Sequence, residues 1–204
     1  MAGKRFMIMA GGTGGHVFPA LATARHLQSM GHEVSWLGSR GGMEVDLIGG
    51  TDIPLWLIAV SGLRGKGGLA RFLAPLRLAR AVVQAWQVLR RVQPDCVVGM
   101  GGFVSGPGGL VAWLMRRPLV IHEQNAIAGM TNRWLSRFAQ ITLEAFPGAF
   151  GAGTVTRCTG NPVRQDLLDL PDPEQRIGAE QRMRILVLGG SRGARVINER
   201  IALA

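Results

Sequence analysis

Cysteines and charged residues are scarce in this sequence. Two cysteines among 204 residues cannot build a disulfide framework, so a reducing compartment is expected. Charged residues make up only 18% of the chain against 47% hydrophobic residues, which excludes an intrinsically disordered chain and allows a sizeable core. The apolar run at residues 6–10 is too short for the hydrophobic region of a secretory signal peptide, and none is expected.

Acidic side chains are in the minority, since 23 lysines and arginines face 13 aspartates and glutamates, for a net charge of +10. Nearly all of this excess lies in residues 1–163. Such a field favours a polyanion, a phosphorylated ligand or an anionic membrane surface. A basic α/β module that binds phosphate or nucleic acid without catalysis therefore stays open as an alternative. No zinc-finger spacing, RNP-like motif or basic helix with heptads is present, so we expect no nucleic-acid partner.

Residues 96–115 carry no charged side chain, and a membrane-spanning helix needs about 20 apolar residues. This segment nevertheless contains Ser105, Pro107 and several glycines, and its first residues have the pattern of a strand. We therefore predict a strand, a glycine-rich loop and a helix here instead of a membrane span.

Short apolar runs alternate with amphipathic segments along the chain, which is typical of βαβ units. The expected strands are Arg5–Ala10, Glu33–Leu37, Pro54–Val60, Asp95–Gly99, Pro118–His122, Ile141–Ala145 and Thr154–Thr159. The expected helices are Pro19–Met30, Pro75–Val92, Gly109–Met115 and Thr131–Phe138. The sequence thus predicts an α/β fold with a Rossmann-like parallel sheet.

The end of the chain resembles its beginning. Residues 164–182 are polar and indicate a connector, and the strand, glycine-rich turn and helix expected at residues 183–204 repeat the pattern of residues 5–30. We therefore expect residues 1–163 to form one domain, and residues 164–204 to form the connector and the first βα unit of a second domain. Because one βα unit cannot build its own core, the chain is expected to belong to a longer two-domain protein.

The first glycine-rich motif, Gly11-Gly12-Thr13-Gly14-Gly15-His16, follows a predicted strand and precedes a predicted helix. Glycines let a ligand approach the backbone, and the N–H groups of a helix N-terminus bind phosphate. The dinucleotide fingerprint G-x-G-x-x-G does not fit because Val17 occupies the third glycine position, and no Walker A motif is present. The motif predicts a phosphate site, with a tight turn that binds nothing as the alternative.

A second glycine-rich loop, Gly99–Gly109, again joins a predicted strand to a predicted helix. Because the carboxyl ends of parallel strands meet at one edge of a sheet, we expect both loops to face the same crevice. Close packing of a helix on the sheet is the alternative explanation for these glycines.

A polar run, His122-Glu123-Gln124-Asn125, follows another predicted strand and can reach the same crevice. His16 lies at a helix N-terminus, which favours the neutral, base-competent form of imidazole. His16 and Glu123 are therefore the candidate general bases. A capping role for His16 and a solvated loop for the polar run stay open as alternatives. No Asp-x-Asp metal motif is visible, and no metal or other cofactor is expected.

The segment Gly189-Gly190-Ser191-Arg192-Gly193 matches G-x-S-x-G, the nucleophile motif of α/β hydrolases. Hydrolases of that fold place the aspartate and histidine of the triad after the serine, and only Ala194–Ala204 follows in this chain. The triad cannot be completed here, so a phosphate- or ligand-binding turn is the better interpretation.

Acidic residues are absent between Asp52 and Asp95, where basic and apolar residues alternate over residues 63–80. An apolar wedge with a basic rim suits a peripheral protein on an anionic bilayer. The predicted membrane residues are Leu69, Phe72, Leu73, Leu76, Arg77 and Arg80. An ordinary core helix with a solvated basic face is the alternative.

These motifs, in this order, closely resemble those of the bacterial MurG family of peptidoglycan N-acetylglucosaminyltransferases. The matching segments are Ala10–Pro19, Ser61–Gly67, Gly99–Gly109, His122–Asn125, Gly160–Arg164 and Leu188–Arg195. The resemblance implies a two-domain GT-B glycosyltransferase, with the acceptor lipid on the N-terminal domain and most nucleotide-sugar contacts on the other. The implied reaction moves GlcNAc from UDP-GlcNAc to the C4 hydroxyl of MurNAc in undecaprenyl-pyrophosphoryl-MurNAc-pentapeptide (lipid I), with inversion, and makes lipid II.

The resemblance also implies site residues and partners. By matching motif positions, the UDP-GlcNAc contacts would be Thr13, Gly14, Gly15, Asn125, Arg164 and Ser191. The glycine-rich loops would bind the acceptor diphosphate at Gly14, Gly15, Gly101 and Gly102. Phe103 stands where relatives often carry tyrosine. The implied partners are UDP-GlcNAc, lipid I, the anionic cytoplasmic face of the inner membrane, and other proteins of cell-wall synthesis and division.

Overall fold

The computed structural model describes residues 3–60, 73–172, 187 and 199–200 of the chain. The chain divides into two compact units, Met1–Arg164 and Gln165–Ala204. The first unit holds the sheet, and the described part of the second unit contains the short helix α7 (Gln165–Leu168). Most of the strand, turn and helix predicted at residues 183–204 lies outside the described residues.

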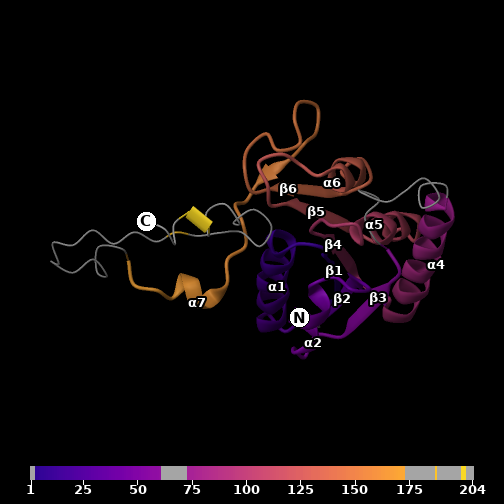
Figure 1. The fold of residues 1–204 in the computed structure, drawn as a ribbon, viewed down its shortest axis with the longest axis horizontal. Helices are drawn as coiled ribbons and strands as arrows, with labels where there is room; N and C mark the ends of the chain where they lie inside the picture. The colour runs from indigo at the N-terminus through magenta and orange to yellow at the C-terminus, as the bar shows by residue number, and fades with distance from the viewer. Residues whose placement is uncertain (1–2, 61–72, 173–186, 188–198, 201–204) are drawn as a thin grey trace. The chain divides into compact units, whose positions relative to one another are not determined.

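The first unit is built on a 7-stranded sheet with the order β3-β2-β1-β4-β5-β6-β7, in which neighbouring strands are parallel (Figure 1). The strands are β1 (Arg5–Met9), β2 (Glu33–Ser39), β3 (Leu55–Ile58), β4 (Cys96–Gly99), β5 (Leu119–Glu123), β6 (Ile141–Glu144) and β7 (Arg157–Cys158). Each predicted strand in this unit is present, although β7 covers only part of its predicted range. The predicted α/β fold class is confirmed.

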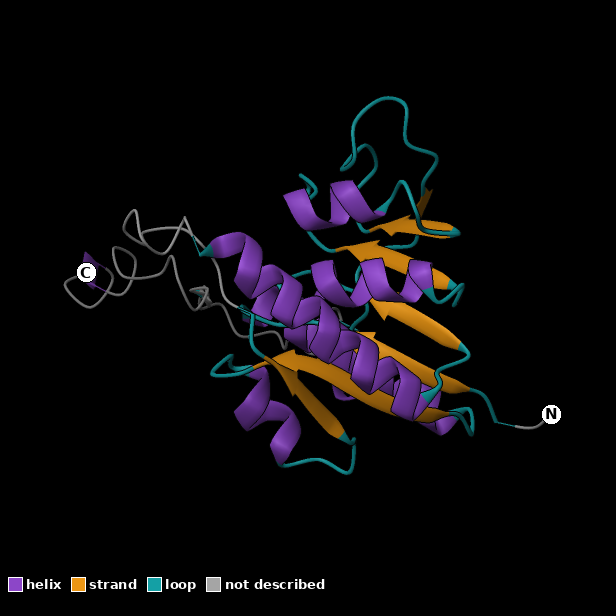
Figure 2. Cartoon of the chain, turned by 90° about the vertical axis from the view of Figure 1, so that its right-hand side faces the viewer, coloured by secondary structure: helices purple, strands orange, loops and turns teal. Residues whose placement is uncertain are grey.

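Helices cover both faces of the sheet (Figures 1 and 2). They are α1 (Gly14–Ser29), α2 (Glu44–Gly49), α4 (Ala74–Val92), α5 (Ser105–Leu114) and α6 (Met130–Leu135). Met7 and Met9 of β1 belong to the core formed with α4, α5 and α6, whereas Ile8 belongs to the core formed with α1 and α2. Because both faces of the sheet are covered, its central strands are nearly continuous apolar runs.

Helix α1 begins at Gly14, so its predicted start at Pro19 is wrong. Pro19 lies inside the helix, where it has no N–H to donate and one helical hydrogen bond is lost. Val17 is fully buried against the sheet and ties the first turns of the helix to the core. This packing outweighs the local preference of proline for a helix start.

Helix α5 begins at Ser105, so its predicted start at Gly109 is also wrong. The buried Ser105 hydroxyl bonds to the Met9 carbonyl oxygen at 3.0 Å, which anchors the first turn on β1. A Cβ on Gly108 would lie 2.3 Å from Met9 Sδ, and one on Gly109 would lie 2.7 Å from Leu135 Cδ2. These two glycines therefore serve close packing of the helix, the alternative that the sequence left open.

Helices α2 and α4 differ in how clearly the sequence predicts them. Helix α2 is missing from the predicted elements because its 6 residues are too few to show a helical period. Helix α4 shows that period clearly, and its buried residues Ala81, Ala85 and Leu89 are spaced four apart on the face toward the sheet. Its predicted bounds differ from the observed ones by a single residue at the start.

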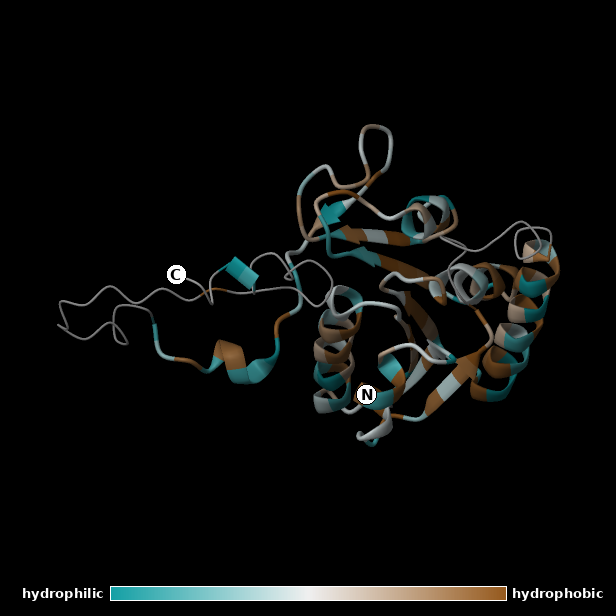
Figure 3. Cartoon of the chain, viewed as in Figure 1, coloured by the Kyte–Doolittle hydropathy of each residue, from teal (hydrophilic) through white to brown (hydrophobic). Residues whose placement is uncertain are grey.

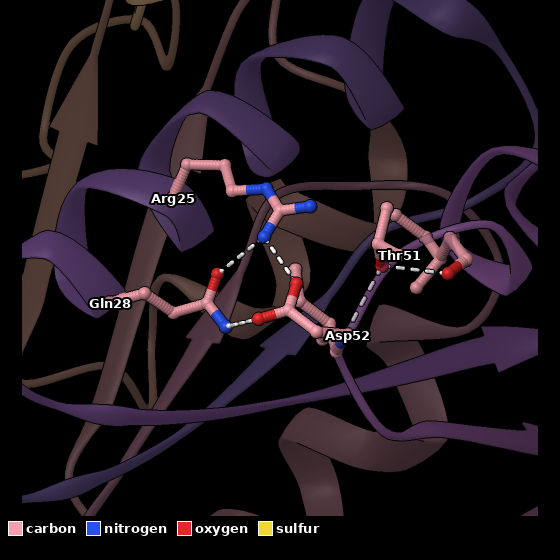
Figure 4. A network of polar contacts seen from close by, with 6 residues as sticks. Arg25, Gln28, Thr51 and Asp52 are labelled. Atoms are coloured by element: carbon pink, nitrogen blue, oxygen red, sulfur yellow. Dashed lines mark hydrogen bonds and ion pairs between the residues drawn. The ribbon is translucent and has the colours of Figure 1, made fainter.

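Polar contacts tie the loop after α2 to helix α1 (Figure 4). The Arg25 guanidinium pairs with the Asp52 carboxylate, and Gln28 Nε2 donates a hydrogen bond to the same carboxylate at 3.1 Å. The hydrogen bond from Arg25 holds the pKa of Asp52 below its usual range. Because exposed ion pairs contribute little to stability, this network positions the loop more than it stabilises the fold.

We predict that Gly108→Ala lowers the free energy of unfolding by about 1–3 kcal/mol, the usual cost of overpacking a core. The added Cβ would meet Met9 and Leu37, and this clash outweighs the better helix propensity of alanine. Gly106→Ala is the matched control, because a Cβ there would meet only Thr131 at 3.6 Å. Chemical denaturation compares the two variants, and equal stability would contradict the packing argument.

Candidate functional site

The strand order reverses between β1 and β4. From β1 the chain proceeds to β2 and β3 on one side of the sheet, and it then returns to β4 on the other side of β1. In open parallel sheets, ligands bind beyond the carboxyl ends of the strands at such a switch point. The two glycine-rich loops follow β1 and β4, so they flank this point.

The two glycine-rich loops contact each other. Gly102 has a φ of +83°, and a Cβ on it would lie 2.2 Å from the carbonyl oxygen of Gly11. Gly101 has a φ of +98°, and a Cβ on it would lie 2.8 Å from the ring of His16. Only glycine permits both the backbone conformation and this close approach. The proximity of the loops expected from the sequence is confirmed, and His16 lies where they meet.

The N-terminus of α1 offers unpaired N–H groups at this place. In the described part of the chain, no acceptor bonds to the main-chain N–H of Gly14 or Gly15, whereas those of His16 and Val17 donate to the Thr13 carbonyl. The first N–H groups of a helix, together with its dipole, attract anions. Gly14 and Gly15 can therefore donate to phosphate oxygens, as their predicted role requires.

Buried Glu44 supports the first loop. Its carboxylate accepts hydrogen bonds from the Gly12 N–H at 3.2 Å, the Ser39 N–H at 2.7 Å and the Ser39 hydroxyl at 2.6 Å. These donors offset the cost of burying a charge. The Gly12 N–H is thereby engaged and not left for a ligand. Nothing in the sequence marks Glu44, because only the fold brings the start of α2 to this loop.

Glu123 is fully buried at the end of β5, and both of its carboxylate oxygens are occupied. Oε1 accepts from the main-chain N–H of Asn125 at 3.0 Å and from its side-chain amide at 2.8 Å. Oε2 accepts from the Gly129 N–H at 3.1 Å and from the Asn132 amide at 2.9 Å. Burial raises the pKa of Glu123, but these hydrogen bonds outweigh burial and hold the pKa below its usual range. The arrangement suits a structural role, and the role of Glu123 as a base stays a prediction.

Hydrogen bonds connect His16 to two buried side chains. His16 Nδ1 lies 2.9 Å from Gln124 Oε1, and Gln124 Nε2 lies 3.0 Å from His122 Nδ1. His122 Nε2 lies 3.0 Å from the carbonyl oxygen of Gly160. Burial lowers the pKa of His122, and the hydrogen bond to Gly160 and the charge of Glu123 oppose this only in part. The sequence places Gln124 in a polar run but gives no sign that it joins two histidines.

Other predicted site residues are exposed or lie outside the described residues. Asn125 is exposed next to Glu123, and Arg164 is an exposed residue at the end of the first unit. Ser191 lies outside the described residues, as do Leu69 and Phe72.

Helix α4 contains both hydrophobic and hydrophilic residues (Figure 3), and exposed side chains of both kinds lie on it. The described members of the predicted membrane set are Leu73, Leu76, Arg77 and Arg80. Leu73 is half-buried just before the helix, and the other three are exposed. Val83 and Trp86 are also exposed, and their spacing from Leu76 places them on the same side of the helix. The membrane set predicted from the sequence lacks these two residues. Which apolar residues of α4 stay exposed depends on how the opposite face of the helix packs on the sheet.

The uncharged segment at residues 96–115 forms β4, a loop and α5, as predicted. Among the described residues, no helix is both long enough and apolar enough to cross a membrane. The same residues contain no group of three or more His, Cys, Asp or Glu side chains placed to hold a metal ion.

We predict that Glu123→Gln lowers the free energy of unfolding by about 1–3 kcal/mol, because the glutamine NH₂ would face buried donors that need an acceptor. The pKa of Glu123 is lower in the folded chain than its ordinary value of 4.5. The carboxylate therefore stabilises the fold above that value, and this contribution is lost as the pH falls through the folded-state pKa.

Denaturation at neutral and acid pH measures the effect of Glu123→Gln, which should shrink in acid. Glu33→Gln is the matched control, since it removes the same charge from an exposed position. A loss of stability equal to that of the control, or one that does not change with pH, would contradict the assigned hydrogen bonds.

Comparisons with known proteins identify the family to which this chain belongs. Residues 6–143 match the model of the glycosyltransferase family 28 N-terminal domain. The chain is 68% identical over 202 residues to a Marinobacter nauticus protein named UDP-N-acetylglucosamine–N-acetylmuramyl-(pentapeptide) pyrophosphoryl-undecaprenol N-acetylglucosamine transferase. This match covers 98% of this chain and 56% of the Marinobacter nauticus protein. A Hahella chejuensis protein of the same name is 58% identical over 199 residues, which cover 98% of this chain and 55% of the relative. The chain thus spans about half the length of the curated relatives it matches.

The crystal structure of Acinetobacter baumannii MurG is also similar, with a TM-score of 0.76 and 44% sequence identity. The match covers 97% of this chain and 56% of that one. The family match at residues 6–143 contains both glycine-rich loops and the polar run after β5. The resemblance to the MurG family is confirmed, and the chain belongs to glycosyltransferase family 28 through its N-terminal domain.

Proposed function

We propose that this chain supplies the acceptor side of an inverting N-acetylglucosaminyltransferase. The enzyme moves GlcNAc from UDP-GlcNAc to the C4 hydroxyl of MurNAc in lipid I and makes lipid II for peptidoglycan synthesis. The names of the Marinobacter nauticus and Hahella chejuensis relatives support this donor and this acceptor. The observation that carries the proposal is the contact of two glycine-rich loops at the switch point, with His16 between them.

The acceptor diphosphate binds at the contact of the two loops in this proposal. Gly14 and Gly15 offer N–H groups at the positive end of α1, and Gly101 and Gly102 hold the second loop against the first. The proposed UDP-GlcNAc contacts are Thr13, Gly14, Gly15, Asn125, Arg164 and Ser191. The net charge of +10 supports two negatively charged substrates.

Inversion requires a single displacement at the anomeric carbon of GlcNAc. The C4 oxygen of MurNAc forms the new bond on one face while the bond to UDP breaks on the other, and the hydroxyl proton passes to a base. His16 is the favoured base because its ring lies at the contact of the loops, whereas both oxygens of Glu123 already accept hydrogen bonds. Main-chain N–H groups stabilise the negative charge that develops on the departing UDP.

We assign residues 1–163 to acceptor and membrane binding, and residues 164–204 to the connector and the start of the nucleotide-sugar domain. The division of the chain into the units Met1–Arg164 and Gln165–Ala204 supports this boundary. The greater length of the relatives supports a second domain that completes the donor site.

Helix α4 and the segment before it are proposed to dock peripherally on the cytoplasmic face of the inner membrane. The lipid acceptor is held in the bilayer, so the enzyme must work close to the headgroups. The proposed membrane residues are Leu69, Phe72, Leu73, Leu76, Arg77 and Arg80. The exposed Val83 and Trp86 extend this surface along α4, and each cation near an anionic surface contributes about 1 kcal/mol. Proteins of cell-wall synthesis and division are proposed partners on the resemblance alone.

We predict that this chain transfers GlcNAc only when the donor site is completed. The extended chain is this chain joined after Ala204 to the remaining C-terminal part of the Marinobacter nauticus relative. It should convert lipid I and radiolabelled UDP-GlcNAc into lipid II, whereas the 204-residue chain should bind lipid I without useful transfer. Chromatography of the labelled lipid measures the amount of lipid II that each chain forms. No transfer by the extended chain would contradict the proposed function, and equal activity of both would contradict the assigned donor contacts.

We predict that Leu76→Asp combined with Val83→Asp abolishes binding to vesicles that contain phosphatidylglycerol. Both side chains are exposed, at 70% and 55%, so the fold should survive while the apolar contact with the bilayer is lost. Val155→Asp is the matched control, because Val155 is 94% exposed and lies outside α4. Co-sedimentation with vesicles measures binding, and unchanged sedimentation of the double variant would place the docking surface elsewhere.

A further inference from the structure

The chain of hydrogen bonds that ends at His16 starts at the main-chain carbonyl oxygen of Gly160, which can accept a hydrogen bond but not donate one. The carbonyl oxygen of Gly160 lies 3.0 Å from His122 Nε2, so this nitrogen carries the hydrogen. His122 is buried, and burial favours the neutral ring by lowering its pKa. In a neutral imidazole with a hydrogen on Nε2, Nδ1 is an acceptor. The fold therefore fixes the tautomer of His122.

The side-chain amide of Gln124 is oriented by His122. Gln124 Nε2 lies 3.0 Å from His122 Nδ1 and 3.1 Å from the carbonyl oxygen of His122, so each of its two hydrogens has an acceptor. A flipped amide would point its oxygen at a carbonyl oxygen and at a nitrogen lone pair, which is unfavourable at both contacts. Gln124 Oε1 must therefore face His16.

This orientation sets the tautomer of His16. Gln124 Oε1 accepts and lies 2.9 Å from His16 Nδ1, so Nδ1 carries the hydrogen. When the ring is neutral, the lone pair is left on Nε2, for which the described residues provide no hydrogen-bond partner. The ring cannot shift toward the second loop, because it already lies against Gly101.

We propose that Gln124 and His122 are positioning residues that hold His16 as the Nδ1–H tautomer and keep Nε2 free to take a proton. This inference rests on the proposed function for the identity of that proton, which is the one on the attacking hydroxyl of the acceptor. Gly160 provides the fixed end of the chain of hydrogen bonds, and no charged residue is needed to set the tautomer. An uncharged orienting group leaves the neutral, proton-accepting form of His16 available.

The tautomer can be read without substrate. Long-range ¹H–¹⁵N spectra of this chain with ¹⁵N-labelled histidine distinguish a ring nitrogen that carries a hydrogen from one that does not. In the wild type with a neutral His16 ring, we expect the hydrogen on Nδ1. In Gln124→Met, which keeps the length of the side chain but removes its acceptor, we expect His16 to change to the Nε2–H form that free imidazole favours.

Activity provides the second readout. In the extended chain, Gln124→Met should lower kcat by about 10–100-fold, the usual effect of losing an orienting partner, with KM for UDP-GlcNAc unchanged. Asn161→Ala is the matched control, because the Asn161 amide bonds at 3.2 Å to the main-chain oxygen of Gln124 and not to its side chain. It should leave both the tautomer and kcat unchanged.

The outcomes separate this inference from the proposed function. A hydrogen on His16 Nε2 in the wild type overturns the inference even if transfer to lipid I is observed, and this spectrum decides the matter if Gln124→Met fails to fold. The expected tautomers without transfer by the extended chain would support the hydrogen-bond chain and contradict the proposed function. A fall in kcat in Gln124→Met with an unchanged tautomer would also overturn the inference.

Discussion

Gly102 and Gly11 meet backbone against backbone where the sheet reverses its strand order, and the space between them excludes even one methyl group. A Cβ on Gly102 would lie 2.2 Å from the Gly11 carbonyl oxygen. This contact joins the loop after β1 to the loop after β4, and it places His16 against Gly101. The N-terminus of α1, the second loop and the histidine thus share one location because two strands and two glycines bring them there.

Buried carboxylates hold the loops of this site in place. Glu44 accepts hydrogen bonds from Gly12 and Ser39, and Glu123 accepts them from the residues that follow β5. An ionised carboxylate is costly to bury unless donors surround it, so each of these side chains constrains the backbone that donates to it. Loops fixed in this way would need little rearrangement to hold the diphosphates of the proposed reaction.

The strands and the meeting of the two glycine-rich loops could be predicted because they depend on local patterns: apolar runs form strands, and the carboxyl ends of parallel strands share one edge. The starts of α1 and α5 could not be predicted. Burial of Val17 extends α1 to before its proline, and burial of Ser105 extends α5 to before its glycines. The glycines of the second loop divide into two roles, left-handed backbone at Gly101 and close packing at Gly108. The role of each glycine depends on contacts between distant segments, which a local sequence pattern does not show. The hydrogen bond between His16 and Gln124 is a further contact of this kind.

We propose that the site at the strand reversal carries out the transfer, with His16 as its base. The most direct test is the kcat of His16→Ala in the extended chain, with saturating UDP-GlcNAc and lipid I. We expect kcat to fall by about 10²–10⁴-fold, the usual loss when a general base is removed, with little change in KM for UDP-GlcNAc. His26→Ala, an exposed change near the other end of α1, should leave kcat unaltered. An unchanged kcat in His16→Ala would contradict the role of His16 as the base.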